Sequence, residues 1–183
     1  VAWAHLRCAE NCNYEPIRGL CWPGRMQEVA SRNRPGLTFM LEGAHNPSGM
    51  KAACDELVQQ VQWSRPWALL LGTSPQTNML GMLEPLANLC TCHPPSAVVL
   101  TEPQFGRYPG VDVATLRSDV ERLGVSVSAA FPMPDEAVNW IESNAHDCER
   151  VLCIGSLYLQ GNVLTALGAD TDDLLAITAK HLS

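Results

Sequence analysis

The sequence predicts an α/β domain, and three observations support this prediction. From about residue 36 onward, short apolar runs with strand character alternate with amphipathic helical patterns. The connections between these segments are short. Strands and helices that alternate in this way build βαβ units, which form a mostly parallel sheet with helices on both faces. We therefore expect a Rossmann-like three-layer domain.

The first predicted elements show the alternation most clearly. Residues 36–43 form an apolar run typical of a strand, and residues 47–62 carry apolar side chains on one helical face. Pro47 suits the first turn of that helix, where its missing N–H needs no partner. The continuous apolar run at residues 67–73 predicts a strand that is buried on both faces.

The second half of the chain repeats this alternation of strands and helices. Asp112 is expected to cap a helix over residues 113–123, and the alternation in residues 125–129 predicts a short strand. The other predicted elements are a helix at 78–90, a strand at 97–101, a helix at 135–145, a strand at 150–155, and helices at 157–167 and 172–182. Residues 1–24 do not fit the alternation of strands and helices, because a helical pattern over 1–12 is followed by an irregular stretch. A chain that starts within a helix without Met suggests a piece of a longer protein.

Composition excludes several classes of partner. The 183 residues carry a formal net charge of −7, with only two lysines, Lys51 and Lys180, and no basic face that could neutralise nucleic-acid phosphates. No apolar run is long enough to span a membrane, and no signal peptide is visible. We expect a soluble domain that binds neither nucleic acid nor membrane, in the cytoplasm or in an organelle.

The eight cysteines favour free thiols in a reducing compartment, because a chain of this length can build a core without disulfides. The tightest cluster is Cys90-Thr-Cys92-His93, which has no second ligand pair at zinc-site spacing. We therefore expect no metal site.

Three polar segments are candidates for a site. The first, Trp22–Gln27 (Trp-Pro-Gly-Arg-Met-Gln), forms a Pro-Gly turn that presents Arg25, a donor suited to phosphate or ribose oxygens. Taken alone, it also fits a surface turn with a solvated arginine. The second, Glu42–Pro47 (Glu-Gly-Ala-His-Asn-Pro), places a carboxylate, an imidazole and an amide at a helix N-terminus, where anions are favoured. It also fits a plain connection in which Asn46 caps the helix.

The third segment, Gly155–Gly161, ends a strand and opens a helix. Ser156 and the first helical N–H groups could bind a carboxylate, although an ordinary N-cap serine would give the same pattern. Ligands of open parallel sheets bind beyond the carboxyl ends of the strands. The second and third segments lie at predicted strand ends, and we expect all three to converge along one rim of the sheet.

In their order along the chain and in their amino-acid sequences, the three segments resemble the C-terminal domain of folylpolyglutamate and dihydrofolate synthases, in the Mur ligase superfamily. That family carries a Trp-Pro-Gly-Arg-x-Gln/Glu turn, then Asp-Gly-Ala-His-Asn-Pro, then Gly-Ser-Leu-Tyr-Leu. The resemblance covers about residues 1–168. It implies a Mur ligase C-terminal type of domain over residues 25–183, preceded at residues 1–24 by the tail of a P-loop ATPase domain and a linker.

The resemblance also implies a reaction. ATP phosphorylates a carboxylate of the folate or dihydropteroate substrate, and the amine of L-glutamate then attacks the acyl phosphate. ATP and Mg²⁺ would be bound mainly by the ATPase domain. Matched by motif, Arg25, Glu42 and His45 would contact the nucleotide, and His45 would be the catalytic residue. The glutamate ligands would be Asn46, Ser156 and Arg107.

Several departures bear on this resemblance. Glu42 stands where the family has aspartate, and residues 73–78 lack the lysine and acids of an Asp-Lys-Asp-like segment. Ser74, Gln76 and Asn78 could form hydrogen bonds there instead. The chain contains no Gly-x-x-x-x-Gly-Lys-Ser/Thr motif, so we expect it to be inactive alone. The alternative is a free-standing, non-catalytic binding module for glutamate or nucleotide. A generic Rossmann-like cofactor domain is disfavoured, because no Gly-x-Gly-x-x-Gly follows a first strand.

Overall fold

The computed structural model describes residues 23–60 and 65–169. Within them, six strands form one sheet in the order β1-β2-β6-β3-β4-β5. All neighbouring strands are parallel except β1, which runs antiparallel to β2. The strands are β1 (Gln27–Ala30), β2 (Thr38–Glu42), β3 (Trp67–Leu71), β4 (Ala97–Thr101), β5 (Ala129–Phe131) and β6 (Arg150–Ile154).

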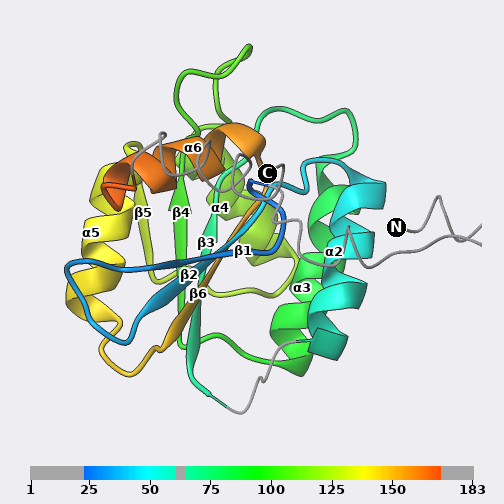
Figure 1. Cartoon of the computed structure of the whole chain (residues 1–183). Helices are drawn as coiled ribbons and strands as arrows, with labels where there is room; N and C mark the ends of the chain where they lie inside the picture. The colour runs from blue at the N-terminus through cyan, green and yellow to red at the C-terminus, as the bar shows by residue number, and fades with distance from the viewer. Residues whose placement is uncertain (1–22, 61–64, 170–183) are drawn as a thin grey trace, which may run out of the picture.

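Helices cover both faces of this sheet (Figure 1). One face packs against α2 (Pro47–Gln60), α3 (Met79–Cys92) and α4 (Val113–Arg122). The other face packs against α5 (Pro134–Asn144) and α6 (Leu157–Ala166). The predicted α/β architecture with a mostly parallel sheet between two helical layers is therefore confirmed.

The central strands explain why the sheet is buried on both sides. All five residues of β3 are buried, and they alternate between the two cores, with Leu69 and Leu71 on one side and Ala68 and Leu70 on the other. Because each face of a parallel sheet is covered by helices, such strands read as continuous apolar runs rather than as alternating ones. This is why residues 67–71 could be recognised from sequence.

Short polar side chains cap the starts of several helices, including α2, α3 and α4. The Asn46 side-chain oxygen accepts a hydrogen bond from Gly49 N (2.8 Å), and Asp112 Oδ1 accepts one from Thr115 N (2.9 Å). Asn78 caps α3 in the same way through Gly81 N (3.0 Å). These bonds satisfy N–H groups that have no partner inside the helix. The predicted cap at Asp112 is confirmed.

Two strands differ from the sequence predictions. β1 was not predicted, since its four residues include Gln27 and Glu28 and only its pairing with β2 makes it a strand. The strand expected at 125–129 is wrong in position, because pairing with β4 begins only at Ser128 and β5 covers Ala129–Phe131. The alternation at 125 and 127 instead reflects valines that pack into the core from an extended connection. The helices expected over 1–12 and 172–182 lie outside the described residues.

Candidate functional site

The three polar segments meet beyond the carboxyl ends of β2 and β6. These strands are parallel neighbours, with Glu42 opposite Ile154, so the second and third segments leave the sheet side by side. The first segment is bonded to the second, because Gly43 N donates to the Gly24 carbonyl (2.7 Å). It also packs against the third, since a Cβ at Gly24 would lie 3.3 Å from Cγ of Gln160. One rim of the sheet thus carries all three segments.

The tight approach of these segments explains the glycine at position 43. A Cβ there would lie 2.3 Å from Cδ2 of Leu157 and 3.2 Å from the Gly24 carbonyl oxygen. The first contact is closer than a Cβ normally approaches and the second is tight, so a side chain at position 43 would force Leu157 to move away from the first turn. The turn itself needs left-handed backbone, with φ of +68° at Gly24 and +47° at Met26.

Glu42 and Arg25 form the central ion pair of the rim. Arg25 Nη1 lies 2.6 Å from Glu42 Oε1, and Met26 N donates to Glu42 Oε2 (3.2 Å). The Glu42 side chain is 5% exposed, whereas that of Arg25 is 42% exposed. A buried carboxylate requires such partners, because its desolvation is otherwise highly unfavourable. The partly exposed guanidinium keeps donors free to reach a ligand.

Comparison of the chain with protein-family profiles gives one match that includes this rim. The sequence profile described as "Mur ligase, glutamate ligase domain" matches residues 24–157. The chain belongs to the Mur ligase family, as one of its glutamate ligase domains. Comparison with curated protein sequences finds no match.

Solved structures show the same fold as this Mur ligase domain. FolC of E. coli, solved with DHPP and ADP, is 19% identical with a TM-score of 0.66, over 92% of this chain and 38% of its own. The bifunctional folylpolyglutamate synthase/dihydrofolate synthase of Yersinia pestis is 22% identical, with a TM-score of 0.65, over 91% of this chain and 37% of its own. Folylpolyglutamate synthase of Mycobacterium tuberculosis, solved with ADP and AMPPCP, is 23% identical with a TM-score of 0.61, over 82% of this chain and 33% of its own. The chain thus spans about a third of the length of these solved proteins.

His45 has a defined ring orientation in the Mur ligase domain. Its Nδ1 lies 2.8 Å from the Gly43 carbonyl oxygen, and its side chain is partly buried. A carbonyl can only accept, so Nδ1 carries the hydrogen of this bond. In the neutral ring Nε2 then keeps its lone pair and can accept a proton or a hydrogen bond.

The other predicted ligands differ in how accessible they are. Asn46 uses its side-chain oxygen to cap α2, and Ser156, 2% exposed, accepts from Tyr158 N (3.1 Å) as the cap of α6. Arg107 is exposed in the connection after β4 and lies over the Tyr108 ring, 5.8 Å from its centroid. That connection reaches α6, because a Cβ at Gly106 would lie 3.0 Å from Tyr158 Cδ2.

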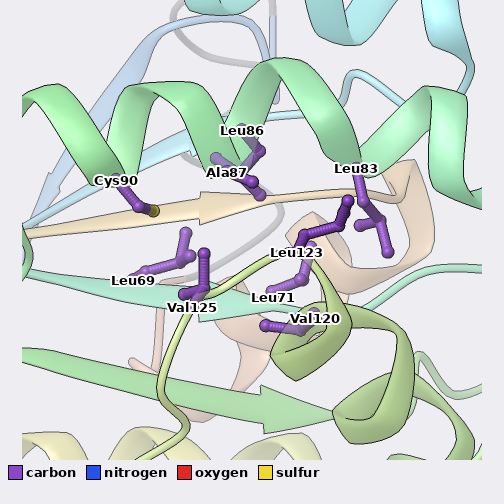
Figure 2. A pocket seen from close by; sticks show the side chains of 9 residues that line it. All are labelled: Leu69, Leu71, Leu83, Leu86, Ala87, Cys90, Val120, Leu123 and Val125. Atoms are coloured by element: carbon purple, nitrogen blue, oxygen red, sulfur yellow. The ribbon is translucent and has the colours of Figure 1, made fainter.

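The surroundings of the rim include an open groove beside the first turns of α6. Exposed apolar side chains border it, among them Phe105 after β4, Met133 before α5 and Tyr158 on α6. A second, narrow pocket between α3, α4 and β3 is lined only by apolar side chains and Cys90 (Figure 2). Because that pocket offers no charged group, it does not suit an ionic ligand such as a nucleotide or an amino acid.

The described part of the chain shows no metal centre, and its Cys54 and Cys90 thiols are buried. No group of three or more His, Cys, Asp or Glu side chains gathers there at metal-binding distance. Burial raises the pKa of the Cys54 and Cys90 thiols to about 12, so both are protonated and poorly nucleophilic at neutral pH. Among the described helices, none has the length and apolar character needed to cross a membrane.

Sequence reasoning missed two glutamines of the rim. Gln27 Oε1 accepts a hydrogen bond from Gly24 N (2.9 Å) and so closes the first turn, and Gln160 connects the second and third segments. Gln160 could have been noticed, since it follows Ser156 by four residues on the buried side of a predicted helix. Gln27 stood in the Trp-Pro-Gly-Arg-x-Gln/Glu pattern, but its bond within the turn could not be predicted, because β1 itself was not visible in the sequence.

We expect Glu42→Gln to lower the free energy of unfolding by about 1–3 kcal/mol, because Arg25 and Met26 N lose a charged acceptor in a buried position. Chemical denaturation of the chain measures this. Asp55→Asn is the matched control, since it removes an acid from an exposed i,i+4 pair with Lys51 and should change stability by no more than about 0.5 kcal/mol. Equal losses in both variants would contradict a structural role for the Glu42 charge.

Proposed function

We propose that this chain is the glutamate-ligase domain of an ATP-dependent folylpolyglutamate synthase. The observation that carries the proposal is the Arg25–Glu42 pair, held at the same rim of the sheet as the start of α6. Membership of the Mur ligase family and a fold shared with folylpolyglutamate synthases support it. Since the chain covers about a third of those proteins, the proposal includes an N-terminal P-loop ATPase domain that completes the cleft.

The proposed reaction proceeds in two steps. ATP transfers its γ-phosphoryl group to a carboxylate of the folate substrate, which gives an acyl phosphate and ADP. The amine of L-glutamate then attacks the acyl carbon, phosphate leaves with the C–O bonding electrons, and the amine loses a proton. In this proposal ATP and Mg²⁺ are held mainly by the ATPase domain, and the enzyme works in the cytoplasm or in an organelle.

Arg25, Glu42 and His45 form the nucleotide side of the proposed site. The guanidinium of Arg25 would contact phosphate oxygens, and the ion pair with the buried Glu42 carboxylate would hold the guanidinium in place. Glu42 replaces the aspartate of the resemblance, and its two oxygens bind Arg25 and Met26 N. Nε2 of His45 would accept the proton that the attacking amine releases.

The glutamate side of the proposed site lies at the start of α6. N–H groups in the first turn of a helix favour a carboxylate, and the cap bond of Ser156 aligns that turn. The Ser156 hydroxyl can still donate its hydrogen, because its cap bond uses only an acceptor site. Asn46 keeps its side-chain N–H₂ as a donor beside the His45 segment, and Arg107 would add a charge from the neighbouring connection.

The alternative function is a non-catalytic module that binds glutamate or nucleotide. One observation favours it: residues 73–78 offer no charged group, and the side-chain oxygen of Asn78 caps α3. Complementation of a folate-polyglutamylation mutant by the full reading frame tests the two functions. The ligase restores growth and the 183-residue chain alone does not, whereas a binding module fails in both forms.

We expect Arg25→Ala in the full-length enzyme to lower kcat/KM for ligation by about ten- to a hundredfold, since one charge-assisted hydrogen bond to phosphate is lost. Arg65→Ala is the matched control, because Arg65 pairs with Glu149 on the exposed surface beside the start of β3. Ligation measured by amide formation should be unaffected in the control. Wild-type turnover in Arg25→Ala would refute the assigned role.

We expect Ser156→Ala to raise KM for glutamate about tenfold, with a smaller change for ATP, because the carboxylate loses its hydroxyl partner. The lost cap also destabilises the domain by about 1 kcal/mol, so both constants are measured well below the unfolding temperature. Thr165→Ala on the same helix removes an exposed hydroxyl that bonds to Gly161 O and serves as control. An unchanged response to glutamate would count against a role for Ser156.

A further inference from the structure

Gln160 is a buried amide that touches every segment of the rim. Gln160 is 3% exposed and lies on α6, one turn after Ser156. Its Nε2 lies within hydrogen-bond distance of three main-chain carbonyls, those of Glu42 (3.0 Å), Ser156 (3.1 Å) and Cys153 (3.3 Å). Its Cγ packs against Gly24, where a Cβ would come within 3.3 Å.

The three carbonyls belong to different parts of the site. One ends β2, one lies near the end of β6, and one immediately precedes α6. Carbonyl oxygens only accept, so the amide must turn its nitrogen toward them and share two N–H groups among three acceptors. A single side chain therefore fixes two strand ends relative to the start of a helix.

Gln160 both loses and gains stability here, because among the described residues its Oε1 is buried without a partner while its Nε2 serves three carbonyls that an apolar side chain would leave without this donor. Its neighbours on the buried face of α6 are apolar, including Leu159 and Val163. Within the described ranges, Oε1 of Gln160 is buried and has no hydrogen-bond partner. A buried acceptor without a partner is unfavourable, and an apolar side chain of similar length would avoid this penalty. What the amide adds is directional bonding to the main chain of the rim.

We propose that Gln160 is a positioning residue of the ligation site, an inference that rests on the proposed function. It holds the Glu42 main chain against the start of α6. The Glu42 carboxylate in turn holds Arg25, so Gln160 sets the separation between the nucleotide side and the glutamate side. Reacting groups must be aligned closely for rapid attack, and a displacement of about 1 Å can slow a reaction about a hundredfold.

Hydrogen exchange of the 183-residue chain tests the positional role directly. Gln160→Met keeps the length of the side chain and removes its donors. In this variant we expect amide exchange in residues 42–46 to become about tenfold faster, while β3 and β4 keep their protection. Val163→Ala is the control, because it weakens the same helix from a fully buried position and Val163 has no side-chain donor for the Glu42 carbonyl. Unchanged exchange at 42–46 in Gln160→Met, or an equal change in Val163→Ala, would overturn the inference.

Kinetics of the full-length enzyme provide the second readout. We expect kcat for Gln160→Met to fall about tenfold with less than about a threefold change in KM for ATP and glutamate, since alignment rather than binding is lost. Gln160→Glu should be slower still, because a carboxylate would face three carbonyl oxygens. Val163→Ala should retain kcat well below its unfolding temperature, and a kcat for Gln160→Met equal to that of the wild type would overturn the inference.

The two measurements separate this inference from the proposed function. If the wild-type full-length protein ligates no glutamate, the proposed function fails, and the positional role of Gln160 is decided by hydrogen exchange alone. If the wild type ligates glutamate and Gln160→Met matches it in both measurements, the proposed function stands and the inference about Gln160 is wrong.

Discussion

The parallel pairing of β2 with β6 is the constraint on which the site depends. It places Glu42 opposite Ile154, although more than a hundred residues separate them along the chain. The segments that follow these strands must therefore leave the sheet at the same edge. Parallel strands in an open α/β sheet expose their carboxyl ends together, which is why ligands of such sheets bind there. Without this pairing, Arg25 and the start of α6 would share no surface.

The buried carboxylate of Glu42 explains much of the local architecture. A charge at this depth needs partners, and the first segment supplies two, the Arg25 guanidinium and the Met26 N–H. Supplying both from adjacent residues requires a sharp turn, which explains the positive φ at Gly24 and Met26. The antiparallel strand β1 then continues from this turn along β2. The Glu42 charge thus binds the turn from one side, while Gln27 and Gly43 hold Gly24 through their own hydrogen bonds.

Polar side chains at the rim stabilise the fold, and in the proposed function they also bind the substrate. Asn46 and Ser156 both cap helices through an oxygen, which leaves the amide N–H₂ of one and the hydroxyl hydrogen of the other free to donate. Helix caps and anion sites use the same unpaired N–H groups at the start of a helix. A motif that caps a helix can therefore also belong to an anion-binding site. The conformation that a cap enforces also orients the donors of the proposed ligation site.

Local sequence was enough to predict the alternation of strands and helices, the buried run of β3 and the cap at Asp112, because each depends on local periodicity or on one side chain beside its own helix. It also indicated Arg25, the 42–47 segment and Ser156 as candidate site residues, because their three segments follow one another in the order of the resembling family. Three features emerged only from the folded arrangement: the strand β1, the start of β5 at Ala129 and the bond between Glu42 and Arg25. The folded arrangement likewise decided that Gln160 joins all three segments of the rim. These features depend on which strands become neighbours, and a contact between distant residues has no local signature in the chain.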